Sequence, residues 1–388
     1  MKICFVRMMP YPYTIGGGTT YLNDLIRSLL KKGHEIHVIT SNASKEMIKN
    51  NPETPAEINI HRIGLPHKKF GRIFLPLDII YRALFEIIFM IALLTEIRKL
   101  KPDVIHTQTL LSESLPLVLF RIPFVVTVYG IHIEGFKEVW NRKKNKIAVL
   151  LSLIYKLMEE FTAKHCRLMI ICTTKRTDEY YSHFGKTILM GSGISFLEFT
   201  RKYKKQRNLY LTLSRLSEQK GLNYLLDALE ILDRKRIKIN FIVAGDGEKE
   251  FVDNLKNRAN KLKNIKVEFV GWVSGEQKKE IYGKSSVFVM PSVFEPFGIT
   301  LLEAMASECA IISSECEGPI NTVKSQFGEL VPYDDEKKRA KNLAETIEKS
   351  LKWNTKSMGK KARKEAEKYD YDKIVDRYLK VYEENRIK

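Results

Sequence analysis

Short apolar runs alternate with longer amphipathic segments along most of the chain. In the first half, Ile3–Val6 and Glu35–Thr40 are predicted strands on either side of a helix over 19–32. Further short strands are expected at Val104–His106, Phe124–Val128 and Leu168–Cys172. Because strands that alternate with helices favour parallel sheets covered by helices, this half predicts a doubly wound α/β domain.

The alternation stops at a basic polar stretch, Arg201–Arg207, and then resumes. The second series predicts strands at 208–213, 238–243, 265–270, 286–290 and 309–313, with helices at 221–234, 248–261, 274–283 and 298–307. We therefore expect two Rossmann-like domains with parallel sheets, over 1–200 and 201–365, and a C-terminal helix over 366–388. In such sheets ligands bind at the carboxyl ends of the strands.

One long apolar segment, Ile73–Leu94, requires a membrane test. Asp78, Arg82 and Glu86 interrupt it, and its last uninterrupted stretch has eight residues, whereas a bilayer span needs ~20. The three charges recur every four residues and can pair along one helical face. We therefore expect an amphipathic helix packed on a sheet.

Composition narrows the class of protein. A chain of 388 residues with 44% hydrophobic and 29% charged residues is typical of a globular protein with two domains. The net charge of +19 favours an acidic partner, which can be nucleic acid, an anionic membrane surface or a phosphorylated substrate. A Lys/Glu-rich surface of the thermophilic type would explain the charge equally well.

The five cysteines form no C-x-x-C pair, so neither a zinc site nor a redox site is expected. Most of them lie in or beside apolar runs, which is typical of reduced, buried thiols in a reducing compartment. The first residues, MKICFVRMMP, lack the features of a secretory signal peptide. We expect a cytoplasmic protein that needs no metal.

The run SVFEPFGITLLEAMASECAII is the most informative part of the sequence. Pro296 is tolerated at a helix start but not inside a helix, so Glu295 should lie in the loop and Glu303 inside the helix. The first helical N–H groups, over 297–300, have no partner within the helix and favour an anion. Gly298 lets a ligand approach the backbone closely. The segment thus offers two carboxylates and a phosphate-binding helix end.

This run resembles the E-x7-E motif of glycosyltransferase family 4, whose members are retaining enzymes of the GT-B fold. The resemblance implies two domains that face a cleft, with the C-terminal helix returning to the first domain. It implies that Glu295 contacts the donor sugar and Glu303 the ribose hydroxyls. It also implies that the backbone of Phe297, Gly298 and Ile299 contacts sugar and diphosphate. Thr300 joins these candidates because its N–H is one of the first in the helix.

Other motifs follow in the order of that family. In L-S-R-L-S-E-Q-K-G-L, Arg215 and Lys220 match the pair that holds the leaving nucleoside diphosphate, and both side chains are expected to be exposed. Their donors also suit phosphate oxygens chemically. The resemblance further assigns donor contacts to two glycine turns, which contain Gly245, Gly247, Gly271 and Trp272.

The first domain carries a glycine loop, Gly16 to Gly18, which lacks the G-x-G-x-x-G spacing of a dinucleotide fold. By resemblance, Gly17 and Gly18 face the donor phosphates and the acceptor. The family often has a His close to the sugar after the fourth strand, but here Tyr129 stands at that position. A Tyr donates a hydrogen bond without acting as a base near neutral pH. Whether Tyr129 or His132 replaces the family His stays open.

The resemblance predicts a retaining hexosyltransferase that uses a nucleotide-sugar donor. The first domain would bind a glycan or lipid-linked acceptor, and the second the donor. Arg215, Lys220, Glu295 and His132 are the catalytic candidates. Three alternatives remain: a cytosolic disaccharide or polysaccharide synthase, a sugar-nucleotide epimerase of the same fold, and a basic nucleic-acid-binding protein. The last would need a recognisable module or aromatic residues interleaved with Arg and Lys, which the sequence lacks, so no nucleic acid is expected as a partner.

A segment over 137–167 bears on location. It combines a basic cluster (Arg142, Lys143, Lys144 and Lys146) with an apolar helix over 147–158. Basic residues beside apolar side chains are typical of proteins that contact an anionic leaflet. A core helix with a solvated basic loop is the alternative. We expect peripheral binding to the inner face of the cell membrane.

Overall fold

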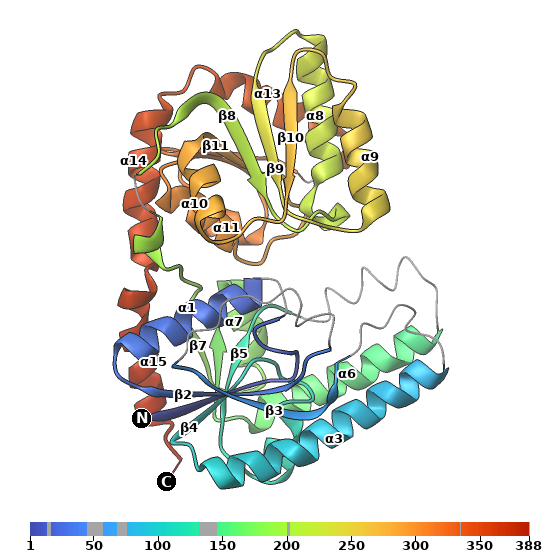
Figure 1. Cartoon of the computed structure of the whole chain (residues 1–388), viewed down its shortest axis with the longest axis vertical. Helices are drawn as coiled ribbons and strands as arrows, with labels where there is room; N and C mark the ends of the chain where they lie inside the picture. Colours follow the sequence, from blue (N-terminus) through green and yellow to red (C-terminus); the bar gives the residue numbers. More distant parts are fainter. Residues whose placement is uncertain are drawn as a thin grey trace. The chain divides into compact units, whose positions relative to one another are not determined.

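The computed structural model describes residues 1–13, 17–44, 57–67, 76–131, 146–199, 202–333 and 335–387. The chain forms two compact units, of which the first comprises Met1–Gly191 and Ile374–Lys388 and the second Ser192–Lys373 (Figure 1). Each unit is built on one parallel sheet covered by helices, so the expected pair of Rossmann-like domains is confirmed.

The first unit contains a sheet of seven strands in the order β3-β2-β1-β4-β5-β6-β7. Helix α1 covers one face, and α3 and α6 cover the other (Figure 1). The strands are β1 (Lys2–Arg7), β2 (Glu35–Asn42), β3 (Asn59–Pro66), β4 (Val104–Thr107), β5 (Val125–Val128), β6 (Leu168–Ile171) and β7 (Thr187–Leu189). The helices are α1 (Gly17–Lys31), α3 (Pro76–Leu100), α4 (Leu115–Leu119), α6 (Lys146–His165), α7 (Lys175–Ser182) and α15 (Tyr371–Glu384).

The second unit contains a sheet of six strands in the order β10-β9-β8-β11-β12-β13. The strands are β8 (Gln206–Leu213), β9 (Asn240–Ala244), β10 (Lys266–Gly271), β11 (Ser285–Met290), β12 (Ala310–Ser314) and β13 (Gly328–Val331). The α-helices are α8 (Leu222–Arg234), α9 (Lys249–Ala259), α10 (Gly275–Lys284), α11 (Ile299–Ala306), α12 (Glu317–Thr322), α13 (Glu336–Ser350) and α14 (Thr355–Ala366). Short 3-10 turns are η1 (Phe196–Glu198), η2 (Glu218–Lys220) and η3 (Glu367–Tyr369). Apolar side chains of α8, α9 and α13 pack on one face, and those of α10, α11 and α14 on the other.

Residues 192–200, which the sequence pattern assigned to the first domain, are grouped with the second unit. Ile194 donates its backbone N–H to Tyr369 and accepts one from Tyr371. Phe196 and Phe199 are buried in a core of the second unit. This segment therefore belongs with β8 and α14 rather than with the first sheet.

The C-terminal helix α15 returns to the first unit, as the resemblance implied. The Tyr378 hydroxyl forms a hydrogen bond with that of Tyr21 on α1. The Tyr382 hydroxyl lies 2.7 Å from Nδ1 of His106 on β4, and Thr127 on β5 contacts the other ring nitrogen at 2.6 Å. These bonds fix the end of the chain against the centre of the first sheet.

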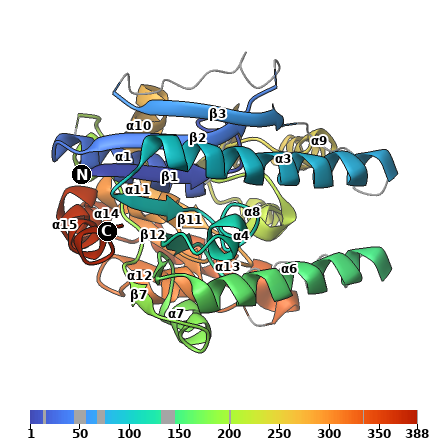
Figure 2. The ribbon, with the colours of Figure 1, turned by 90° about the horizontal axis from the view of Figure 1, so that it is seen from below.

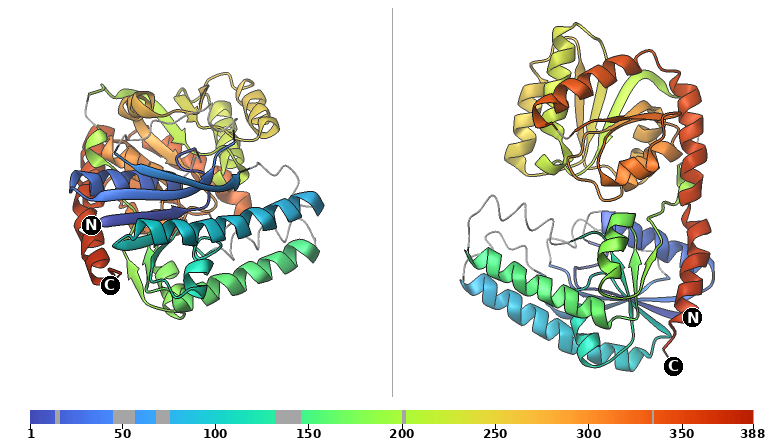
Figure 3. Two further views of the ribbon diagram at one scale, coloured as in Figure 1. Left: turned by 60° about the horizontal axis from the view of Figure 1, so that its bottom comes forward. Right: turned by 180° about the vertical axis from the view of Figure 1, so that it is seen from behind.

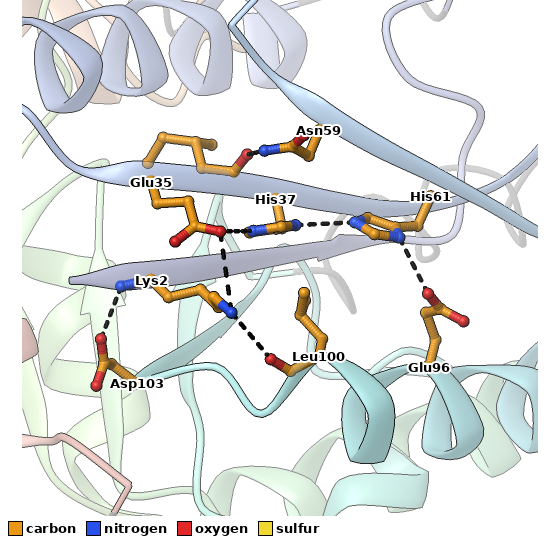
Figure 4. Close-up of polar contacts among 9 residues, drawn as sticks. Lys2, Glu35, His37, Asn59, His61, Glu96, Leu100 and Asp103 are labelled. Atoms are coloured by element: carbon orange, nitrogen blue, oxygen red, sulfur yellow. Dashed lines mark hydrogen bonds and ion pairs between the residues drawn. The ribbon is translucent and has the colours of Figure 1, made fainter.

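Strand β3 is an edge strand that the apolar pattern did not predict, and polar side chains hold it in place (Figure 4). His37 on β2 contacts Glu35 through Nε2 and His61 on β3 through Nδ1, each at 2.8 Å. The other ring nitrogen of His61 lies 3.0 Å from Oε1 of Glu96 on α3. This row of hydrogen bonds ties β3 to β2 and to α3, and so fixes the register that an apolar run would otherwise supply.

Candidate active site

Three loops meet at the carboxyl edge of the second sheet, where the strand order reverses between β8 and β11. Such a switch point is the usual ligand site of an open α/β sheet. The Val293 N–H donates to the Gln219 carbonyl, and the Gly318 N–H to the Glu295 carbonyl, both at 2.9 Å. A Cβ on Gly221 would lie 1.8 Å from the carbonyl oxygen of Pro291. These close approaches bring the predicted residues of separate loops together.

Lys220 and Glu295, which were predicted independently, form an ion pair. Nζ of Lys220 lies 2.7 Å from Oε2 of Glu295, and the two side chains are 18% and 15% exposed. The expectation that Lys220 is exposed was therefore wrong, because the carboxylate and the adjoining loop cover it. Arg215 is exposed, as expected. The loop after β8 thus presents an exposed cation, Arg215, and a cation that is paired with a carboxylate, Lys220.

Glu303 is buried inside α11, and two side chains of α10 bind its carboxylate. Nζ of Lys278 lies 2.5 Å from Oε1, and the Tyr282 hydroxyl donates to Oε2 at 2.9 Å. Lys278 and Tyr282 are one helical turn apart, so they project from the same face of α10. The sequence analysis did not single out either residue. A carboxylate has about four acceptor positions, so these two bonds leave capacity for a further donor.

Helix α11 begins at Ile299, and Gly298 is its N-cap with φ 93°. That conformation strains any residue with a Cβ, which explains the glycine. Ile299 and Thr300 are the first helical residues, so their N–H groups have no partner within the helix. A Cβ on Gly318 would lie 2.6 Å from the carbonyl oxygen of Phe297. The predicted anion-binding backbone is therefore held by a tightly packed loop.

The two glycine turns have a structural role in addition to the predicted one. A Cβ on Gly245 would lie 1.8 Å from the Ser214 carbonyl oxygen, and one on Gly247 would lie 2.0 Å from that of Leu216. These glycines therefore allow the loops after β8 and β9 to touch. Gly271 has φ 72° with open space around its Cα, and Trp272 beside it is 50% exposed. The indole ring is accessible to a planar ligand.

In the first unit, Tyr129 follows β5 and donates its hydroxyl to Oε1 of Gln108 at 2.5 Å. Its ring meets Tyr21 edge-on at 5.4 Å. Gly18, near the start of α1, lies against the same ring, and Gly17 is exposed. Burial raises the pKa of Tyr129 well above its usual value, so the hydroxyl keeps its proton. His132 lies outside the described residues, so the choice between it and Tyr129 stays a prediction.

Two further residues near Tyr129, in the first unit, were not predicted. Gln108 follows β4 at the switch point of the first sheet, and its Nε2 is buried without a hydrogen-bond partner in the part of the chain that the structure describes. Glu113 is buried and accepts the Met8 N–H at 3.1 Å. Burial raises the pKa of its carboxyl to about 7. The position of Gln108 after a central strand could have identified it, whereas nothing in the sequence around Glu113 points to a carboxylate at this edge.

No cluster of three or more His, Cys, Asp or Glu side chains suitable for a metal occurs among the described residues. All five cysteines are free, and all but Cys166 are buried, as expected. Likewise, the described helices include none that is long and apolar enough to cross a membrane. The basic cluster over 142–144 lies outside the described residues, and the side chain of Lys146 is not described.

Comparison with protein families assigns both halves of the chain. The model of glycosyltransferase family 4 matches residues 15–188, and that of glycosyl transferases group 1 matches residues 195–368. The chain belongs to glycosyltransferase family 4. It is therefore a glycosyltransferase of the GT-B type, as the E-x7-E motif indicated.

Relatives support this assignment along the whole length of the glycosyltransferase. An uncharacterized glycosyltransferase of Methanocaldococcus jannaschii is 26% identical over 98% of each chain. The alpha-monoglucosyldiacylglycerol synthase of Acholeplasma laidlawii is 25% identical over 77% of this chain and 76% of its own.

Solved structures share the fold of this glycosyltransferase. The sucrose-phosphate synthase of Thermosynechococcus elongatus aligns with a TM-score of 0.76 at 18% identity, over 98% of each chain. Anabaena HepE in complex with UDP-glucose aligns with a TM-score of 0.69 at 16% identity, over 99% of this chain and 100% of that one.

Proposed function

We propose that this glycosyltransferase transfers a hexosyl group from a nucleotide-sugar to an acceptor with retention of configuration, and that it requires no metal. The observation that carries the proposal is the ion pair between Lys220, on the loop after β8 that also carries the exposed Arg215, and Glu295, in the loop that leads to the start of α11. Cations and free helical N–H groups together are a binding arrangement for a diphosphate.

Charge that develops on the leaving diphosphate is stabilised by this group. Arg215 is exposed and can bind two phosphate oxygens with its planar guanidinium. Lys220 is held by Glu295 and retains donors for a phosphate oxygen. The first N–H groups of α11 add fixed dipoles. Loss of one such donor typically costs about 3 kcal/mol of transition-state stabilisation.

The two carboxylates recognise the sugars of the donor. Glu295 stands at the loop end of the site and accepts hydroxyls of the transferred hexose. Glu303 lies inside α11, with its carboxylate oriented by Lys278 and Tyr282, and accepts the ribose hydroxyls. The half-exposed Trp272 stacks on the nucleotide base. Anabaena HepE, of the same fold, was solved with UDP-glucose, which supports a nucleotide-sugar as donor.

The first unit binds the acceptor beside Gly17, Gly18 and Tyr129, and His132 stays the alternative to Tyr129. We assign the acceptor to lipid-linked or membrane-surface glycans. The similarity to a synthase whose name specifies a monoglucosyldiacylglycerol, a glycosylated lipid, supports this class. The Tyr129 hydroxyl keeps its proton and donates it to Gln108, so its oxygen can accept a hydrogen bond from a hydroxyl of the acceptor.

Donor binding is tested by calorimetry with UDP-, GDP- and ADP-glucose. We expect one of them to bind, and we expect Arg215→Ala to weaken it by about tenfold or more, since charge-assisted hydrogen bonds contribute about 1.5–3 kcal/mol. Arg207→Ala is the matched control, because Arg207 is also exposed but lies near the amino end of β8. Failure of all three donors to bind, or equal losses in both variants, would refute the proposal. NMR of the product's anomeric proton tests retention.

A further inference from the structure

Helix α3 turns an apolar stripe toward solvent. One face of α3 packs on the first sheet through Phe85, Phe89 and Leu93, as expected for an amphipathic helix. The opposite face was expected to be charged, but Glu86 instead bonds Ser112 at 2.7 Å within the fold. The solvent-facing positions are apolar and follow helical spacing at Leu84, Ile87, Ile88 and Ile91.

Helix α6 carries a second exposed stripe of the same kind. Figures 2 and 3 show α3 and α6 side by side on the outer surface of the first unit, running in the same direction. The Tyr155 hydroxyl of α6 lies 3.4 Å from Oε1 of Glu86, which confirms that the helices are neighbours. The exposed stripe of α6 consists of Leu153, Ile154, Leu157 and Phe161.

Helix α4 lies between the two helices (Figure 2). Its last residue, Leu119, and Phe120, which follows it, are both more than half exposed. We refer to these ten side chains of α3, α4 and α6 as the apolar platform. Single exposed apolar side chains are normal on soluble proteins, whereas a gathering of large ones on neighbouring helices indicates a binding surface. Ile91 and Leu157 are 62% and 66% exposed, so the platform is not simply the rim of a core.

The charged groups around the platform are mostly cationic. Arg98, Lys99, Arg121 and Lys164 are exposed on the same three helices or directly after them. The described acidic side chains of these helices are taken up by other contacts. Glu86 bonds Ser112, Glu96 bonds His61 and pairs with Lys99, Glu159 bonds Tyr181, and Glu160 pairs with Lys156. Two copies packed face to face would bring like charges together, whereas an anionic surface would be complementary.

We propose that the apolar platform is a membrane-docking surface, on which the glycosyltransferase lies against an anionic lipid leaflet. The aliphatic and aromatic side chains of α3, α4 and α6 enter the boundary between headgroups and acyl chains. The flanking Arg and Lys side chains contact the headgroups. This mode needs only two helices in the plane of the interface, because apolar area and basic charge act together.

The test uses the full-length protein and vesicles of phosphatidylcholine with or without phosphatidylglycerol. The wild type is expected to sediment with the anionic vesicles. Ile91→Ser combined with Leu157→Ser should reduce partitioning by about tenfold or more, since each exposed aliphatic side chain contributes roughly 1 kcal/mol when partly buried. The matched control is Leu197→Ser combined with Ile320→Ser, because these side chains of the second unit are 67% and 49% exposed.

Two further measurements complete the test, one on the basic side chains and one on the oligomeric state. Arg98→Ser, Arg121→Ser and Lys164→Ser together should weaken binding to anionic vesicles and make it less sensitive to salt. Circular dichroism and light scattering report folding and mass for every variant. The proposal is overturned if the platform and control variants bind equally. It is also overturned if the wild type is a dimer that the platform substitutions dissociate, and if neither the dimer nor the dissociated variant binds vesicles.

Discussion

The Lys220 ammonium donates to the Glu295 carboxylate across 2.7 Å, although the residues lie in loops that follow different strands. Two residues assigned to the donor therefore hold each other in place before any ligand arrives. A partly buried carboxylate that loses its cation is destabilised, because neither water nor another charge fully replaces the partner.

Lys220→Ala should therefore lower the free energy of unfolding by about 1–2 kcal/mol in addition to slowing turnover. Arg215→Ala should change it by less than about 0.5 kcal/mol, since the side chain is exposed. Urea unfolding of both variants measures the difference. The double variant Lys220→Ala/Glu295→Ala should be less destabilised than the sum of the single ones. Strict additivity would mean that the ion pair contributes nothing.

Lys278 should matter for ribose recognition through its bond to Glu303. Lys278→Met leaves the Glu303 carboxylate with the Tyr282 hydroxyl as its described polar partner, so the carboxylate is less well oriented. We expect the preference for a ribonucleoside diphosphate over its 2′-deoxy analogue to fall about five- to tenfold, because roughly one hydrogen bond is affected. Calorimetry with both ligands measures this ratio.

Lys279→Met is the control for that experiment, since Lys279 is the next residue on α10 and pairs with Glu198 instead, at 3.4 Å. If Lys278→Met binds both nucleotides less tightly but with an unchanged ratio, its bond to Glu303 is merely structural. If the wild type binds no nucleotide, the proposed function fails, and the role of Lys278 fails with it.

Glu113 should make stability depend on pH. Its pKa is about 7 in the folded state against an ordinary value of 4.5. The folded protein thus binds this proton more tightly than the unfolded chain does. The resulting contribution of Glu113 to the free energy of unfolding is fully present below pH ~4.5 and is lost as the pH rises toward 7. Glu113→Gln should remove this pH dependence, which changes the free energy of unfolding by about 3 kcal/mol between low and high pH. Urea unfolding at pH 5 and pH 8 tests this, and equal pH dependence in both proteins would contradict it.

His106 should produce the opposite slope. Burial lowers its pKa to about 3, so the ring is neutral between Tyr382 and Thr127. The unfolded chain takes up a proton on His106 near pH 6.5. The contribution of the neutral ring to the free energy of unfolding is therefore present above that pH and is lost as the pH falls toward 3. We expect a loss of order 4 kcal/mol at pH 3, which His106→Gln should largely remove. Thermal unfolding between pH 4 and pH 7 checks the sign, and a wild type no more acid-sensitive than the variant would count against it.

The sequence predicts most of the fold because the local signals for helices, strands and turns agree with the overall α/β topology. In the segment around Glu295 and Glu303, a proline, a glycine and a helix start stand in a fixed order, and α11 begins at Ile299, one residue after the predicted start. Strand β3 was missed for the converse reason. Its partners, His37 and Glu96, come from distant segments, and no apolar run marks it.

The site was only partly predictable for the same physical reason. Arg215, Lys220 and Glu295 follow strands of one sheet, so their meeting at one edge can be expected from the topology. The bonds from Lys278 and Tyr282 to Glu303 depend on how α10 packs against α11. The exposure of Ile91 and Leu157 depends on which face of each helix packs against the sheet. A period in the sequence identifies an apolar face but not what lies against it.

The placement of α15 has a consequence for the order in which the protein is made. Tyr378 and Tyr382 complete the first unit, yet they follow the whole second unit in the chain. On the ribosome, the first sheet must wait with His106 uncovered while all the residues of the second unit emerge and can fold. We therefore expect the half translated first to be the half completed last, and to be the one that depends on chaperones when translation stalls.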